Sequence, residues 1–270
     1  MIHKQLSRVK RKLRRIITER NPELAKKLFK DSPSFFCPVC RKATNMLALP
    51  TVYLAKMLEH RCIHNIFLAE TLNIEHYSCS NCGASDRDRL YALYLEKYLS
   101  QKKSISLVDV APANQLAHFI RQFTNVSYRS TDLHMEVVDD LQDITDMHLY
   151  ANEQFDFFIC SHVLEHIPDD KKAMAELYRI LKKGGSGIAM VPINFGVTET
   201  LEDPTITDVA IRWKLFGQYD HVRMYAKNNF ILRLNEIGFH VELLDINYFG
   251  AEVFKIAAIF QSSVLYIVTK

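Results

Sequence analysis

The sequence predicts an α/β fold built on a mostly parallel β-sheet, preceded by a small cysteine-rich domain and a basic helical arm. The main evidence is residues 155–192, which read as strand, loop, helix and strand. Phe155 to Cys160 is a continuous apolar run, as expected of a parallel strand covered on both faces. A pair of CxxC motifs and a concentration of positive charge in residues 1–30 indicate the other two parts.

The helix of this unit is expected between Lys171 and Leu181. Its apolar residues recur on one helical face: Met174, Leu177, Tyr178 and Leu181. We expect Gly184-Gly185 to form the helix C-cap. A second apolar strand, Ile188 to Val191, follows and ends at Pro192. Two such parallel strands joined by a helix form a right-handed crossover.

The chain has 270 residues, enough for one sizeable core and a small appended domain. No apolar run approaches the roughly 20 residues that span a bilayer. The basic N-terminus also lacks the apolar segment of a signal peptide. We therefore expect a cytoplasmic protein, in which six cysteines favour metal ligation over disulfides.

Residues 1–30 are predicted to form a basic amphipathic helical arm. They hold eleven Lys or Arg against two Glu, a net charge of +9; since the whole chain carries +3, the other 240 residues carry −6. Apolar residues recur at spacings of four and three: Ile2, Leu6, Val9, Leu13 and Ile16. Three interpretations stay open: a solvated helix packed on the protein, peripheral contact of residues 1–20 with the anionic inner face of the membrane, and contact with nucleic-acid phosphates.

Residues 31–95 are predicted to form a four-cysteine metal-binding domain with a helical insert. Cys37, Cys40, Cys79 and Cys82 make two CxxC motifs, and Gly83 suits the sharp turn behind the second. Each motif places two thiolates on one tetrahedral ion. The ion is expected to be structural zinc, although iron takes the same ligands. Alternatives are free buried thiols, a redox pair, or replacement of one ligand by His60, Cys62 or His64.

Residues 104–270 are predicted to form the catalytic domain. The expected strands are Ser106–Val110, Val126–Thr131, Phe155–Ser161, His240–Leu244 and Val264–Val268, and the expected helices include 115–123 and 228–237. Residues 194–225 interrupt this pattern after the strand that ends at Val191. We interpret them as an insert in the catalytic domain.

The tract VLEHIPDD…ELYRILKKGG closely resembles the corresponding region of class I S-adenosylmethionine (SAM) dependent methyltransferases. With CPVC…CSNCG…RDRL, an Ala-Pro motif and FGQYDHVRMY, the chain resembles a bacterial group of these enzymes that carries an N-terminal cysteine-knuckle domain and is associated with surface-polysaccharide synthesis. The resemblance covers roughly the last two-thirds of the chain. It implies a Rossmann-like sheet with an antiparallel last strand, SAM as cofactor and a methyl acceptor. It also implies that residues 194–225 form an acceptor-side insert, the usual position for acceptor recognition in this family.

The resemblance also implies the cofactor residues. Ligands of open parallel sheets bind at the carboxyl ends of the strands, here beyond Val110, Thr131 and Ser161. The implied contacts are Asp109 and Ala111 near the methionine end, Asp132 and Leu133 at the ribose, Asp143 and Ile144 at the adenine, and Ser161 near the methyl group. Asp146 is an alternative to Asp143, and Asp132 could instead cap a turn.

The loop after the first strand departs from the family pattern. Related enzymes carry GxGxG, but Ala111, Ala113 and Gln115 stand here, and members of the resembling group usually have Glu where this chain has Ala113. Glycine allows close approach and positive φ, whereas Pro112 lacks an N–H donor. The departure therefore puts cofactor affinity in question.

Two histidines are the predicted catalytic residues. His162 follows the strand that faces the reacting methyl in this family, where it could act as a general base. The alternative is that His162 and His166 orient Glu165. His221 belongs to the cluster Asp220, His221, Arg223 and Tyr225, which forms either a polar acceptor site or an internal salt-bridge network.

We therefore predict a SAM-dependent methyltransferase that methylates an oxygen of a small-molecule acceptor, a sugar or glycan precursor. One alternative is an RNA methyltransferase that holds phosphate with the basic arm. Another is a methyltransferase fold that has lost catalysis and binds a partner, motivated by the missing glycines. The acceptor, the metal and the oligomeric state are not fixed by the sequence.

Overall fold

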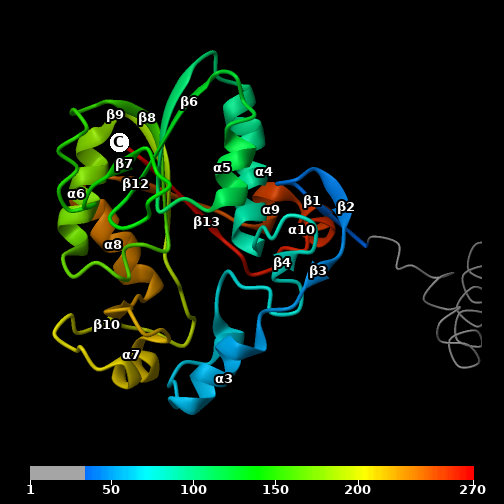
Figure 1. Ribbon diagram of the computed structural model, residues 1–270, viewed down its shortest axis with the longest axis vertical. Helices are drawn as coiled ribbons and strands as arrows, with labels where there is room; N and C mark the ends of the chain where they lie inside the picture. The colour runs from blue at the N-terminus through cyan, green and yellow to red at the C-terminus, as the bar shows by residue number, and fades with distance from the viewer. Residues whose placement is uncertain (1–33) are drawn as a thin grey trace, which may run out of the picture. The chain divides into compact units, whose positions relative to one another are not determined.

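The computed structural model describes residues 34–270, and the predicted basic arm over residues 1–30 lies outside this range. Phe35–Lys270 form one compact unit. A central sheet with helices on both faces makes up most of it (Figure 1). No helix within residues 34–270 has the length and apolar character needed to cross a membrane.

The central sheet has seven strands in the order β12-β13-β9-β8-β5-β6-β7. Their bounds are β5 Ile105–Val110, β6 Val126–Asp132, β7 Asp140–Leu141, β8 Phe155–Ser161, β9 Leu181–Met190, β12 His240–Leu244 and β13 Leu265–Thr269. The strands from β9 to β7 are parallel, whereas β13 runs antiparallel to both β9 and β12. The predicted fold class, a mostly parallel Rossmann-like methyltransferase sheet with an antiparallel last strand, is confirmed.

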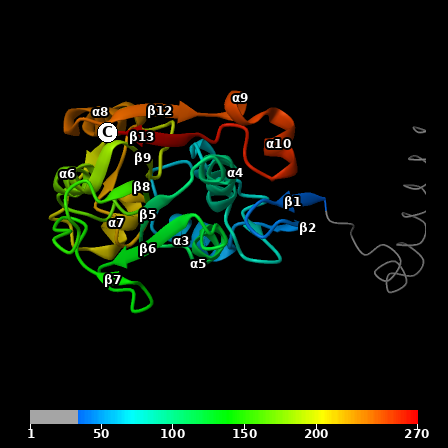
Figure 2. The same cartoon turned by 90° about the horizontal axis from the view of Figure 1, so that it is seen from above.

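Helices cover the two faces of this sheet in pairs. Helices α4 (Asp86–Ser100) and α5 (Asn114–Ile120) lie on one face, and α6 (Asp170–Ile180) and α8 (Lys227–Ile237) lie on the other (Figures 1 and 2). Residues 157–160 of β8 are consequently buried without alternation. This explains why the sequence of the strand reads as one apolar run.

The prediction of a C-cap at Gly184-Gly185 is wrong. Helix α6 ends at Ile180, and both glycines lie within β9, where Leu181 pairs with Phe155. The N–H of Gly184 donates to the carbonyl of Lys270 at 2.9 Å, and Gly184 has a φ of +72°. The pair thus forms an irregularity in the strand, because pairing with the end of the chain outweighs the local preference of glycine for a helix end.

The cysteine-rich part consists of short elements and one helix. Its strands are β1 Phe35–Cys37, β2 Lys42–Thr44, β3 Met46–Leu47 and β4 Ser78–Cys79, and its helices are α3 Thr51–Glu59 and the single 3-10 turn Ile66–Leu68. The insert between the two CxxC motifs is therefore helical only in part. The remainder is irregular chain that lies along the acceptor-side insert.

The acceptor-side insert contains β10 Leu201–Glu202, α7 Val209–Phe216 and β11 Arg223–Met224. Helix α3 lies beside α7 (Figure 1). The ring of His60 stacks on Trp213 with centroids 5.8 Å apart, and the hydroxyl of Tyr53 donates to the carbonyl of Gly217 at 3.2 Å. His64 Nε2 lies 2.6 Å from the Leu215 carbonyl. The two inserts, far apart in sequence, thus close over the same end of the sheet.

Helix α4 ties the cysteine-rich part to the rest of the chain. Ser85 caps it and forms a capping box with Asp88. The fully buried Arg89 donates to backbone carbonyls on both sides of the junction: those of His76, Tyr77, Ala84, Ala257 and Ala258. The last two residues follow α9 (Ile246–Phe249) and α10 (Ala251–Ile256). Arg89 therefore has a complete structural role.

Candidate active site

The loop between β5 and α5 adopts a glycine-like backbone without glycine. Ala111 has a φ of +51°, in the left-handed region, and its N–H donates to the carbonyl of Thr131 at 2.9 Å. Ala113 has an ordinary φ of −77° and precedes α5, while Gln115 lies inside the helix. Of the three positions that carry glycine in the family motif, only Ala111 therefore requires the unusual conformation, which costs an L-residue about 1–2 kcal/mol.

Asp132, the predicted ribose ligand, lies at the end of β6 and is half-buried. Its Oδ1 accepts hydrogen bonds from the N–H groups of His134 at 2.7 Å and Met135 at 2.8 Å. One carboxylate oxygen is thus engaged in capping a turn, the alternative considered from the sequence. Oδ2 makes no hydrogen bond within residues 34–270 and is the oxygen that could meet a ribose hydroxyl.

Asp109 and Ser161 occupy the ends of β5 and β8. Asp109 is buried and accepts a hydrogen bond from the Tyr128 hydroxyl at 2.8 Å. Burial raises the pKa of Asp109 to about 7, although the Tyr128 hydrogen bond opposes the change. The hydroxyl of Ser161 lies 2.8 Å from that of Tyr91. Both predicted cofactor residues therefore already have protein partners.

The remaining predicted cofactor residues lie on loops at the same edge of the sheet. Asp143 is exposed, and its Oδ1 accepts from the N–H of Thr145 at 2.7 Å. Ile144 is buried in the core, whereas Leu133 is half exposed. Asp143 and Leu133 are accessible to a ligand, but little of the Ile144 side chain is available to pack on an adenine ring.

A cavity of about 500 Å³ opens beyond the ends of β8 and β9. Its wall comes from the insert between the two CxxC motifs, from the loop after β8, from the segment after β9 and from the acceptor-side insert. The predicted catalytic residues His162 and His221 both line it. Among residues 34–270, none of the seven predicted cofactor residues does. The structure thus brings the two histidines together in one cavity.

His162 begins the loop after β8 and has a φ of +56°. Its N–H donates to the carbonyl of Met190 at 2.8 Å, and its Nδ1 lies 3.3 Å from Oε1 of Glu165. Burial lowers the pKa of His162 well below its usual value, so the ring is neutral at physiological pH. The sequence alternative, in which His162 neighbours and orients Glu165, therefore agrees with the geometry.

Glu165, His166 and His221 form a cluster in the cavity wall. Nε2 of each histidine lies 4.0 Å from Oε1 of Glu165. His166 Nδ1 lies 3.3 Å from Asp220 Oδ2, and His221 Nδ1 lies 3.0 Å from the Phe216 carbonyl. Burial raises the pKa of Glu165 to about 8 and lowers the pKa of His221 to about 4. It also lowers the pKa of His166.

Arg223 and Tyr225, predicted as possible acceptor contacts, belong to an internal network. Arg223 is buried and donates to the carbonyls of Leu164 and Pro168 and to Glu202. The Tyr225 hydroxyl donates to Asp170, which also receives Arg233 at 2.6 Å. The salt-bridge alternative is therefore correct for these two residues, and only His221 of the cluster faces the cavity.

Arg87 lines the cavity and was not recognised from the sequence as a site residue. It lies in the RDRL segment, where Asp88 completes the helix cap and Arg89 binds backbone carbonyls. The sequence did carry a signal, because Arg87 is a third charged residue beside two that have structural roles. On a helix it points in a different direction from those two residues. Arg87 supplies positive charge to the cavity wall.

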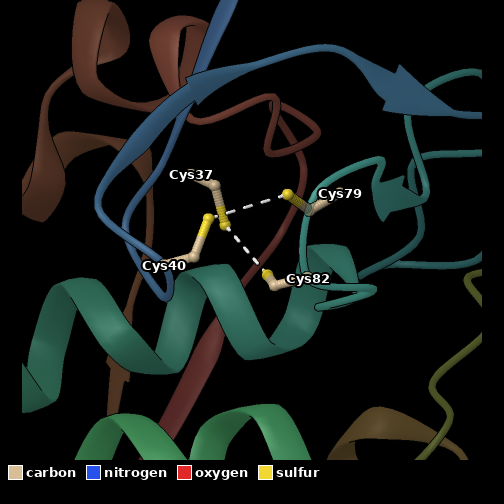
Figure 3. A group of neighbouring side chains, drawn as sticks. All are labelled: Cys37, Cys40, Cys79 and Cys82. Carbon is tan, nitrogen blue, oxygen red and sulfur yellow. Dashed lines mark hydrogen bonds between the residues drawn. The ribbon is translucent and has the colours of Figure 1, made fainter.

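The four predicted metal ligands converge (Figure 3). Sγ of Cys37 lies 3.8 Å from that of Cys82, and Sγ of Cys40 lies 3.9 Å from that of Cys79. A tetrahedral ion with ~2.3 Å metal–sulfur bonds needs sulfur atoms about 3.8 Å apart. These residues therefore fit a zinc or iron ion, whereas Cys62 and His64 lie beside the acceptor-side insert.

The thiols of this cluster differ in acidity. Burial raises the pKa of Cys37, and raises that of Cys82 to about 11. The pKa of Cys79 falls to about 7 despite burial, because the N–H groups of Cys82 and Asn81 and the Thr44 hydroxyl stabilise its thiolate. Gly83, with a φ of +80°, makes the turn behind the second motif, as predicted. A side chain there would contact Gln115 of α5.

A comparison with protein families finds a matching domain family. Residues 91–189, from α4 through most of β9, match the model of a family described as a methyltransferase domain. The match and the sheet order support a class I SAM-dependent methyltransferase domain. A search of curated proteins found no match.

Solved structures with a similar chain course include methyltransferases from several organisms. A SAM-dependent methyltransferase from Archaeoglobus fulgidus is 12% identical, with a TM-score of 0.43, over 67% of this chain and 92% of that one. One from Mesorhizobium loti is 12% identical, with a TM-score of 0.42, over 65% and 97%. Phosphoethanolamine N-methyltransferase 2 from Haemonchus contortus, in complex with SAM, is 13% identical, with a TM-score of 0.45, over 70% and 53%.

Proposed function

We propose that this chain transfers a methyl group from SAM to an oxygen of an acceptor bound in the cavity, and that the acceptor is a sugar or glycan precursor. The observation that carries the proposal is the position of His162. Its ring lines the cavity directly after β8, at the strand end that faces the methyl group in related enzymes. The proposed cofactor edge and the proposed acceptor cavity thus meet at this residue.

The reaction is an in-line displacement in which the protein supplies alignment and a base. The acceptor oxygen attacks the methyl carbon, the carbon–sulfur bond breaks, and S-adenosylhomocysteine leaves with the sulfur electron pair. His162 accepts the hydroxyl proton through Nε2, since Nδ1 lies beside Glu165. His221 and Arg87 also line the cavity and contribute to the binding of the acceptor.

On the cofactor side, Oδ2 of Asp132 is assigned to the ribose and Asp109 to the methionine end. Loss of a buried acceptor leaves ribose hydroxyls unpaired, at about 1–3 kcal/mol each. Asp132→Ala should therefore weaken SAM binding at least about tenfold. Asp203→Ala is a matched control, because Asp203 also caps the N–H two residues ahead, at 2.9 Å, but lies on the acceptor-side insert.

Calorimetric titration of SAM and S-adenosylhomocysteine tests the proposal. Wild-type protein and His162→Ala should bind both ligands equally well, while His162→Ala should lose methyl transfer to hydroxyl acceptors. Absence of binding by folded wild-type protein would reject the enzyme in favour of a partner-binding module. Pro112, which offers no N–H, and the engaged Oδ1 of Asp132 favour that second candidate.

The four cysteines are proposed to hold one structural zinc ion, for which iron is the alternative. Zinc sites of this kind contribute directly to folding. Cys79→Ser should release the ion and unfold residues 35–85. Metal analysis of purified protein that finds far less than one equivalent of zinc plus iron would contradict this assignment.

Residues 1–20 are proposed to contact anionic membranes, which would place the enzyme at the inner face of the membrane. Deletion of these residues should abolish salt-sensitive binding to anionic vesicles and leave SAM binding unchanged. Equal vesicle binding by the two proteins would reject the contact. Loss of tight RNA binding on deletion would instead favour an RNA acceptor.

A further inference from the structure

Three side chains of the cavity wall have the chemistry and spacing of a metal site. Glu165, His166 and His221 each present one ligand atom, and the three atoms lie within 4.8 Å of one another. The site is separate from the cysteine cluster, and it contains no sulfur. A set of two histidines and one carboxylate is the donor set of catalytic zinc sites and of non-haem iron(II) sites.

Glu165 is the strongest indication that a cation binds here. Its side chain is 1% exposed, and both carboxylate oxygens are buried without a hydrogen-bond partner in residues 34–270. Within the same residues, its only neighbours at ion-pair distance are histidines. A buried carboxylate is normally paired, hydrogen-bonded or bound to a metal. Glu165 lines the cavity, so a ligand could satisfy it.

The two histidines are oriented as metal ligands are. A carbonyl oxygen only accepts hydrogen bonds, so the Phe216 carbonyl selects the His221 tautomer with a proton on Nδ1. The Asp220 carboxylate, 3.3 Å from His166 Nδ1, favours the same tautomer there. In both rings the unprotonated Nε2 then faces Glu165. Metal-binding histidines characteristically donate their other N–H to a carboxylate or a carbonyl.

The distances suit a site that closes slightly on its ion. Ligands bound at about 2.0–2.2 Å lie roughly 3.0–3.5 Å from one another, and here Oε1 lies 4.0 Å from each Nε2. A contraction of roughly 0.5–1 Å by these side chains is sufficient. We propose that Glu165, His166 and His221 bind a divalent transition-metal ion, zinc or iron(II), at the cavity wall.

Such an ion would keep an open coordination position. Three protein ligands complete neither a tetrahedral nor an octahedral shell, and all three residues line the cavity of about 500 Å³. The open position suits an oxygen of a bound molecule or of water. A metal-bound hydroxyl is more acidic than a free one, and His162, 3.3 Å from Glu165, lies beside it.

Metal content of the full-length protein tests the site without any assay of methyl transfer. After removal of metal and reconstitution with excess zinc followed by gel filtration, wild type should retain about two equivalents, one in each site. Glu165→Gln and His221→Ala should each retain about one. His148→Ala is the matched control, because His148 is an exposed histidine outside the cavity, and it should retain about two.

A titration with manganese(II), followed by electron paramagnetic resonance, separates the two sites, because manganese favours oxygen and nitrogen over thiolate ligands. Wild type and His148→Ala should bind it, and Glu165→Gln should not. Glu165→Gln preserves side-chain volume and removes a buried carboxyl group that has no hydrogen-bond partner in residues 34–270, so its metal-free form should melt close to or above the wild-type temperature. Equal metal content of wild type and Glu165→Gln, or manganese binding by both, would overturn the proposal.

Discussion

The loops that follow β5 and β8 share a backbone conformation but differ in how their polar groups are satisfied. Ala111 and His162 each follow a strand, each donate an N–H to the next strand along the sheet, and each have a φ slightly above +50°. After β5, the polar groups are satisfied locally, as when Tyr128 donates to Asp109. After β8, Glu165 is buried with no hydrogen-bond partner in the described part of the chain.

This difference shows which assignments rest on geometry. A polar residue whose hydrogen bonds are complete has a structural explanation, and its role in ligand binding rests on its position in a family pattern. A buried polar residue without a partner needs a further explanation, and a ligand provides one. The proposed cofactor edge, apart from Oδ2 of Asp132, is of the first kind, whereas the cavity around Glu165 is of the second.

The largest predicted effect concerns the support of the β8 loop. Arg223 is 2% exposed and donates to the Leu164 carbonyl, directly before Glu165. Arg223→Ala should lower the free energy of unfolding by about 3–5 kcal/mol, because it empties buried volume and leaves the carbonyls of Ile167 and Pro168 without their donor. Arg233 still pairs with Asp170 and Glu202 in this variant. Urea unfolding measures this loss.

Lys171→Ala is the control for this substitution. Lys171 pairs with Glu236 at 2.8 Å on the surface, where both side chains are about half exposed. An exposed pair contributes roughly 0–1 kcal/mol. Similar losses for Arg223→Ala and Lys171→Ala would mean that the network beneath the cavity does not hold the loop.

The next effect concerns Asp109 and the pH dependence of stability. Its pKa is raised from an ordinary 3.8 to about 7 in the folded protein. The folded state therefore binds a proton that the unfolded state lacks between these pH values, and stability falls as pH rises through about 7. The linkage amounts to up to roughly 4 kcal/mol between pH 4 and pH 8.

Asp109→Asn should remove this dependence. Asparagine keeps an oxygen for the Tyr128 hydroxyl but does not ionise, so the stability advantage of the variant should grow from pH 4 to pH 8. Tyr128→Phe, which removes the hydroxyl that donates to Asp109 at 2.8 Å, should steepen the dependence. If the free energies of unfolding of wild type and Asp109→Asn changed with pH in parallel, ionisation of Asp109 would not destabilise the folded state.

The fold was largely predictable from the sequence because its central strands are continuous apolar runs. The predicted strands Phe155–Ser161 and His240–Leu244 coincide with β8 and β12. Gly184-Gly185 was misassigned because a glycine pair marks a helix end and a strand irregularity equally well. Only the pairing of β9 with the end of the chain, at Lys270, distinguishes them.

The candidate site was predictable in its parts and not in its assembly. The spacing of the CxxC motifs predicted the cysteine cluster, and the position of His162 directly after a strand drew attention to a residue that lines the cavity. The approach of His221 and Glu165 to 4.0 Å depends on how the acceptor-side insert folds back, which no local pattern records. Tertiary packing likewise places Arg223 in the network with Glu202 beneath the cavity and not in the cavity itself.

The smallest predicted effect tests the loop after β5 directly. Ala111 holds a φ of +51°, which disfavours any residue with a Cβ by about 1–2 kcal/mol. Glycine relieves this strain, but it also raises the entropy of the unfolded chain by an amount equivalent to about 0.4–1 kcal/mol. Ala111→Gly should therefore stabilise the protein by roughly 0.5–1 kcal/mol, seen as a higher urea midpoint with an unchanged slope.

Ala117→Gly, within helix α5, is the opposite case. Its backbone is helical, so glycine there should destabilise by at least about 0.5–1 kcal/mol. SAM affinity of Ala111→Gly should equal that of wild type, because the alanine backbone already adopts the required conformation. Destabilisation by Ala111→Gly would mean that the loop takes another path, and the parallel between the loops after β5 and β8 would then fail.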